Sequence, residues 1–99
     1  MEDLRSVVVD RLQAASQVAF SKHVVNRMIE RNVLLSMDKI ARLNQGVNLA
    51  EEKSLEEPLI MVDGTIFLVS IRHNKVITTM DATDLLGNVF TNIDGAVII

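Results

Sequence analysis

A single Asp-Gly dipeptide between two apolar runs constrains the fold of this chain more than any other feature. The runs are residues 59–62 and 65–71, and Asp63-Gly64 separates them. Two-residue connections of this kind favour a type I′ turn, in which both residues have positive φ. The sequence therefore predicts a β-hairpin in this region.

The second strand of this hairpin carries apolar side chains on both sides. Successive side chains of a strand point to opposite faces of the sheet. One face carries Ile66, Leu68 and Ser70, and the other carries Phe67, Val69 and Ile71. Such a strand is typical of the centre of a sheet that is covered on both faces.

Further elements are expected after this hairpin. His73-Asn74 predicts a second turn, because Asn tolerates the left-handed region, and residues 75–80 then form a third strand. Asp81 is expected to cap a short helical turn. The tail, residues 89–99, is apolar to its last residue. Since chain ends are usually polar and loose, we expect this tail to dock as a fourth strand or in a partner.

Two capped helices are expected before the sheet. Ser21 is a suitable N-cap for a helix over residues 22–31, and Ser36 is suitable for a second helix over 37–45. Gly46 is expected to end the second helix, because glycine readily adopts the left-handed conformation that follows many helices.

The remaining segments carry weaker patterns. Residues 1–16 have apolar side chains at near-helical spacing, which predicts an amphipathic helix or arm. Residues 48–57 are rich in glutamate and are expected to form a linker. We therefore divide the chain into an arm, 1–19, and a single α+β domain, 20–99. In this domain N-terminal helices pack on a three- to four-stranded, mainly antiparallel sheet.

Composition excludes several classes of function. The chain has 99 residues and no cysteine, which excludes disulfide frameworks and thiolate chemistry. Its net charge of −3 argues against bulk binding of nucleic acid. We find no signal peptide and no run of about 20 apolar residues, so we expect a cytoplasmic protein without membrane contact. No phosphate loop, catalytic triad or dinucleotide motif is present, and we expect no cofactor and no metal.

Two stretches of the sequence resemble the small bacterial flagellar operon proteins. Residues 20–33, FSKHVVNRMIERNV, resemble the family pattern F-S-x-H-a-x-x-R-l-x-x-R-x-I. Residues 88–99 resemble the ending of that family nearly residue for residue, and residues 76–81 add a shorter match. The genes of the family lie among those for hook and hook-cap proteins, and no established activity comes with it. The resemblance thus implies a non-enzymatic accessory protein of flagellar hook assembly, acting as chaperone, scaffold or regulator on a hook or hook-cap protein.

A basic stripe lies on the first predicted helix, where His23, Arg27 and Arg31 recur every four residues and share one face. The candidate interaction surface combines this stripe with residues of the C-terminal matching stretch: His23, Arg27, Arg31, Phe90, Asn92 and Asp94. Three interpretations of the stripe stay open. It is a surface for an anion or nucleic acid, a surface for an acidic protein partner, or a structural network in which the arginines pair with aspartates such as Asp81 or Asp94. Lys22, Lys39 and Arg42 are candidates to extend it.

A second resemblance sharpens the nucleic-acid interpretation. A helix with the pattern H-x-x-x-R-x-x-x-R before a small sheet is similar to RelE-type ribonuclease toxins. That resemblance implies RNA contacts by Arg72, His73, Lys75 and Thr78. The acidic net charge counts against RNA, as does the absence of Tyr and Trp, which are the best stacking platforms. RNA binding or cleavage is therefore the alternative function.

The apolar tail also predicts an edge at which another chain can dock. Phe90 and residues 97–99, together with Met61 and Val62, could form an edge that accepts a strand from a partner or from a second copy in a homodimer. The opposing interpretation is that the tail completes the core of its own domain, because a free apolar edge invites aggregation.

Overall fold

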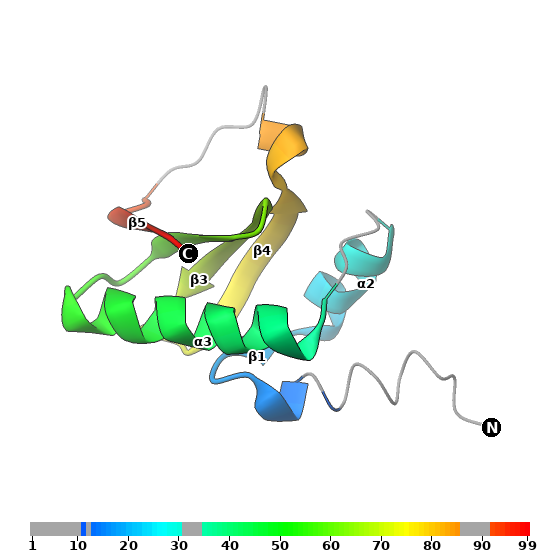
Figure 1. Ribbon diagram of the computed structural model, residues 1–99, viewed down its shortest axis with the longest axis horizontal. Helices are drawn as coiled ribbons and strands as arrows, with labels where there is room; N and C mark the ends of the chain where they lie inside the picture. Colours follow the sequence, from blue (N-terminus) through cyan, green and yellow to red (C-terminus); the bar gives the residue numbers. More distant parts are fainter. Residues whose placement is uncertain (1–10, 12, 31–34, 86–91) are drawn as a thin grey trace.

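The computed structural model describes residues 11, 13–30, 35–85 and 92–99. Within these residues the chain has an α+β fold, in which two α-helices pack on a five-stranded sheet of order β1-β4-β3-β2-β5 (Figure 1). The elements in chain order are β1 (Ala19–Phe20), α2 (Lys22–Glu30), α3 (Met37–Glu52), β2 (Pro58–Val62), β3 (Thr65–Ser70), β4 (Lys75–Asp81), the 3-10 helix η1 (Ala82–Leu85) and β5 (Gly95–Ile98). The division of the chain between residues 19 and 20 stays a prediction.

The sheet is mixed, so the prediction of a mainly antiparallel sheet of three to four strands is only partly right. β2, β3 and β4 form the expected antiparallel meander. β1 adds to β4 and β5 adds to β2, both in parallel. These parallel neighbours lie far apart in sequence, and such pairs leave no local signal comparable to a tight turn. The helical elements are also not all N-terminal, because η1 follows β4.

Both predicted turns are present. Asp63 and Gly64 have φ of 48° and 78°, as a type I′ turn requires. Asn74 has a φ of 55° and lies in the second turn, between β3 and β4. The pairing of β3 with β4 shifts register between Leu68 and Val69, which leaves Ile77 as an extra residue on β4.

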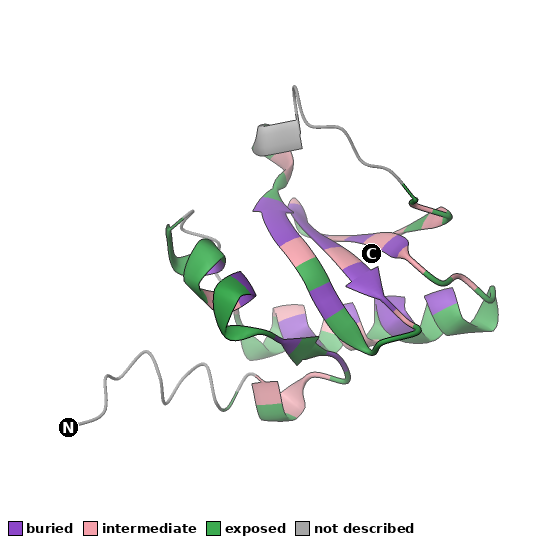
Figure 2. Cartoon of the chain, turned by 180° about the vertical axis from the view of Figure 1, so that it is seen from behind, coloured by how far each residue is buried: buried purple, intermediate pink, exposed green. Residues whose placement is uncertain are grey.

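The core lies between the helices and one face of the sheet. The buried residues of α2 and α3 point toward the strands, while the outer sides of both helices are exposed (Figure 2). The ring of Phe20 meets that of Phe67 edge to face, with centroids 6.4 Å apart, a favourable aromatic arrangement. Phe67 on this face and Ile66 on the other are both buried. This confirms that β3 is a central strand covered on both sides.

The second helix is longer than the sequence indicated, because Gly46 lies inside α3 and does not end it. Gly46 is buried, and a Cβ built there would come within 2.6 Å of Cγ2 of Ile60. The glycine thus permits a close approach of helix and strand. The predicted linker is accordingly helical up to Glu52.

α3 ends in a Schellman motif that lacks the usual glycine. Ser54 has a φ of 58° and its N–H donates to the carbonyl of Glu51 over 3.0 Å, while the N–H of Leu55 donates to the carbonyl of Ala50 over 3.0 Å. Glycine is the common residue at this position. The serine explains why the sequence placed the end of the helix at the earlier Gly46.

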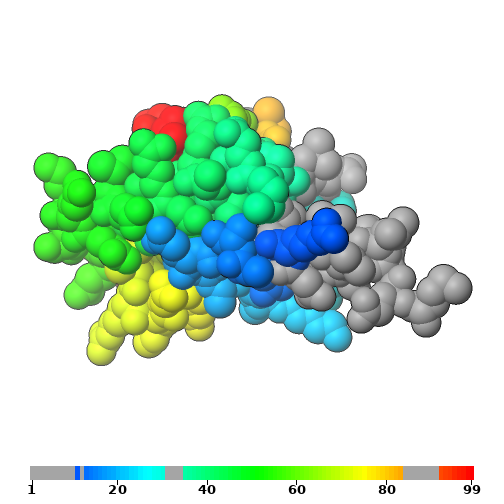
Figure 3. Space-filling model, turned by 60° about the horizontal axis from the view of Figure 1, so that its bottom comes forward, coloured from blue at the N-terminus to red at the C-terminus, as the bar shows by residue number. Residues whose placement is uncertain are grey.

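The segment before β1 is fastened to α3. Residues 13–15 are helical, and residues 13–19 run beside α3 in the space-filling view (Figure 3). The side-chain amide of Asn44 accepts the N–H of Gln17 over 2.8 Å and donates to the carbonyl of Ala15 over 2.9 Å. Most of the predicted helix over residues 1–16 lies outside the described residues.

Candidate interaction surfaces

α2 presents the first two residues of the predicted basic stripe to solvent. The Ser21 hydroxyl accepts the N–H of Val24 over 3.1 Å, which confirms Ser21 as the N-cap. Val24 and Met28 are buried on the inner face of the helix. His23 and Arg27 are exposed to solvent. Arg31, the third residue of the stripe, lies outside the described residues, as does Phe90.

The carboxylates of Asp94 and Asp81 both accept hydrogen bonds from backbone N–H groups. The two carboxylate oxygens of Asp94 accept the N–H groups of Glu56, over 2.6 Å, and Glu57, over 3.0 Å. The hydrogen bond from Glu56 is the main cause that lowers the pKa of Asp94. Asp81 accepts the N–H of Thr83 over 2.9 Å and its hydroxyl over 2.8 Å, and these bonds lower the pKa of Asp81. Asp94 therefore joins the start of β5 to the start of β2. Asn92 is exposed, with a φ of 66°.

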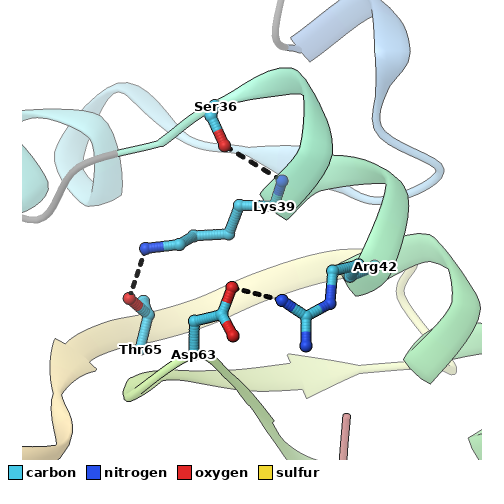
Figure 4. A network of polar contacts seen from close by, with 5 residues as sticks. All are labelled: Ser36, Lys39, Arg42, Asp63 and Thr65. Atoms are coloured by element: carbon cyan, nitrogen blue, oxygen red, sulfur yellow. Dashed lines mark hydrogen bonds and ion pairs between the residues drawn. The ribbon is translucent and has the colours of Figure 1, made fainter.

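Lys39 and Arg42 do not extend the stripe, because both side chains are directed to the turn between β2 and β3. Arg42 forms an ion pair with Asp63, and the Lys39 ammonium donates to the Thr65 hydroxyl over 2.8 Å (Figure 4). The backbone of Lys39 is itself capped by Ser36, whose hydroxyl accepts its N–H over 3.1 Å. These contacts fasten α3 to the hairpin, and no short-range sequence pattern indicates them, because they link residues more than 20 positions apart.

An open hollow of about 380 Å³ lies where the start of α2 meets the turn between β3 and β4. It brings His23 together with His73 and Lys75, which the sequence placed in separate groups. Glu57 supplies a carboxylate and Ser70 a buried hydroxyl. Among the described residues no cluster of three His, Asp or Glu side chains is arranged to hold a metal ion.

β5 forms one edge of the sheet. The N–H of Ile99 donates to the carbonyl of Met61 over 2.9 Å. Because backbone groups of a strand alternate in direction, the polar groups of Ala96 and Ile98 point away from β2 toward the free side. Val97 and Ile99 pack against the core, whereas 75% of the Ile98 side chain is exposed. Residues 95–99 of the tail therefore dock in their own sheet, as one interpretation predicted, and leave Ile98 exposed at its edge.

Residues 76–98 match a family model described as "Putative flagellar". This match confirms the flagellar resemblance over a stretch that includes most of β4, all of η1 and all of β5. Searches of curated proteins and of solved structures gave no match. No helix in the described part of the chain is long and apolar enough to cross a membrane.

Proposed function

We propose that this chain is a non-enzymatic, cytoplasmic accessory protein of flagellar hook assembly and binds its partner along the outer edge of β5. The observation that carries the proposal is that the flagellar match includes β5, which is an outer strand of the sheet that the described residues form and has an exposed apolar side chain. A strand edge recognises an extended segment through backbone hydrogen bonds, and neighbouring side chains add specificity.

Three common obstacles to such pairing are absent from the sequence and pairing of β5. Natural edge strands are commonly blocked by lysine, proline or a bulge, and residues 95–98 contain none of these. Ile98 is the most exposed large apolar residue in the described chain. An added strand would place its own side chains beside Ile98 on the same face and would satisfy the outward backbone groups of Ala96 and Ile98.

The partner expected here is a hook or hook-cap protein that presents an extended apolar segment before it assembles. A chaperone that covers such a segment needs a surface that binds main-chain groups more than particular side chains. A sheet edge has that property, because it binds through backbone hydrogen bonds.

Co-purification with the hook and hook-cap proteins tests this function. Ala96→Pro removes an N–H that points to the free side, so an edge strand tolerates it while an added strand loses a hydrogen bond. We expect this variant and Ile98→Lys to lose most of the captured partner. Met37→Lys is the matched control, because Met37 is an exposed apolar residue (58% exposed) on α3, and it should retain the partner.

Two results would contradict the proposal. One is equal capture of a flagellar protein by Ala96→Pro and by the unchanged chain, which would place the contact elsewhere. The other is a wild-type chain whose only partner is a second copy of itself, seen as a dimer by light scattering and lost in Ile98→Lys. That outcome would assign the edge to a homodimer.

RNA binding remains the second candidate, because His73 and Lys75 lie beside His23 at one hollow. In that case exposed cations on α2 and on the turn after β3 would act together on phosphates. An electrophoretic shift assay with Arg27→Ala and Arg72→Ala tests it. RNA that is bound equally by these variants, or not bound by the wild-type chain, would remove this candidate.

A further inference from the structure

The hollow beside α2 gathers polar side chains from three separate parts of the chain. Its volume, about 380 Å³, falls within the range of roughly 300–1,000 Å³ that is common for small-molecule sites. Its polar lining consists of Ser21, His23, Glu57, Ser70, His73 and Lys75. Its remaining walls are aliphatic. The hollow therefore combines polar groups with a surface for a carbon skeleton.

Hydrogen-bond donors outnumber acceptor-only groups in this lining. Each imidazole, of His23 and of His73, carries at least one N–H, and Lys75 carries three donors and a positive charge. Ser70 is 2% exposed, and its oxygen accepts the N–H of His73 over 3.2 Å. A hydroxyl whose oxygen accepts one hydrogen bond can also donate its own O–H. Glu57 is the single carboxylate among the lining residues.

The charges at the start of α2 also favour an anion in the hollow. A helix start carries a partial positive charge, which acidic side chains in the first turn usually offset. α3 follows this rule with Asp38, whereas α2 has no acidic residue in its first turn and begins with Lys22 and His23. A departure from a local rule without an evident structural gain is expected at functional sites.

We propose that this hollow binds the phosphate group of a small organic molecule. Lys75 supplies the charge, the imidazoles of His23 and His73 donate to the phosphate oxygens, and the Ser70 hydroxyl donates from the floor. The carbon body of the ligand packs against the aliphatic walls formed by Val24, Val76 and Ile77. A tetrahedral group with several acceptor oxygens suits donors that arrive from different elements. The residues that line this hollow do not come from β5, and the site does not depend on the flagellar proposal.

Titration with phenyl phosphate, followed by amide NMR shifts of the full chain, tests the site. We expect saturable shifts at His23, His73 and Lys75, with tighter binding than inorganic phosphate, which lacks the apolar body. Lys75→Met should weaken binding about tenfold or more. Glu57→Gln should strengthen it several-fold, because a like charge is removed from the hollow. Lys53→Met, an exposed change at the end of α3, is the matched control and should bind normally.

Three outcomes would overturn the proposal. The first is a lack of saturable shifts up to about 10 mM phenyl phosphate, which is weaker than most specific small-ligand sites. The second is an equal loss of affinity in Lys53→Met and Lys75→Met, which would indicate general charge attraction. The third is equally tight binding of benzoate, which would assign the hollow to carboxylates. The dispersion of each variant's spectrum shows whether it is folded, and Lys75→Arg should keep most of the affinity.

Discussion

The two edges of the sheet are built alike but differ in exposure. Each is a parallel strand on the antiparallel meander, and each is fastened by one side chain that reaches distant backbone, Asn44 beside β1 and Asp94 beside β5. Phe20 of β1 is 5% exposed, whereas Ile98 of β5 is 75% exposed. Both strand additions thus contribute side chains to the core, and the β5 edge in addition leaves a large apolar side chain exposed.

The largest expected effect tests whether the first edge is part of the core. Phe20→Ala removes a buried ring that packs on Phe67, and we expect a loss of about 3–5 kcal/mol in the free energy of unfolding. Ile98→Ala at the other edge should change it by less than about 0.5 kcal/mol. Urea denaturation of both variants measures the difference. Similar losses in the two variants would show that the edges contribute equally to stability.

An intermediate effect is expected at the side chain that fastens β1. Asn44→Ala leaves the N–H of Gln17 and the carbonyl of Ala15 without their partner. The bond to the carbonyl of Ala15 is part-buried and the bond from Gln17 is exposed, so we expect a loss of about 1 kcal/mol in the free energy of unfolding. Asn48→Ala, at an exposed position one turn further along α3, is the control and should change little. An equal loss of stability in Asn48→Ala would mean that the loss reflects a change in helix propensity and not the contact of Asn44 with the segment before β1.

The smallest expected effect concerns acid stability at the second edge. Hydrogen bonds from the backbone of Glu56 and Glu57 lower the pKa of Asp94 below its ordinary value of 3.8. Its contribution to stability is therefore complete above that value and is lost as the pH falls through the lower folded pKa. Asp94→Asn should be less stable near neutral pH and should lose less stability than wild type below about pH 4.

Thermal unfolding at several pH values measures the effect at Asp94. Asp81→Asn removes the other carboxylate whose pKa is lowered, at the end of β4 and away from the β5 edge. It should change the acid response without weakening the attachment of β5, as judged by hydrogen exchange at Val97 and Ile99. Faster exchange at these two residues in Asp81→Asn than in Asp94→Asn would contradict the role assigned to Asp94.

Local chemistry made part of the fold predictable. Asp63-Gly64 determined a turn, Ser21 and Ser36 determined helix starts, and the two apolar faces of β3 placed it at the centre. The errors came from features set by tertiary contact. Gly46 has the residue type of a helix end but faces Ile60, and Ser54 occupies a position that glycine usually takes.

The candidate surface was predictable only where it is local. The spacing of His23 and Arg27 placed them together on the exposed side of α2. The place of Asp94 on an interaction surface stays a prediction. The sequence did not indicate that its carboxylate accepts backbone N–H groups of residues almost forty positions earlier. The meeting of His23 with His73 and Lys75 depends on the parallel pairing of β1 with β4, for which the sequence gives no short-range signal.

The placement of β1 and β5 also has a consequence for the order of folding. The two hairpins of the meander close over short loops, so they can form early at little entropic cost. Both outer strands pair with residues far away in sequence, and such contacts form late. During synthesis β2 leaves the ribosome well before β5, so its apolar edge stays open until the last strand docks. A newly made chain thus passes through a stage in which the site later occupied by β5 is available to any other extended strand.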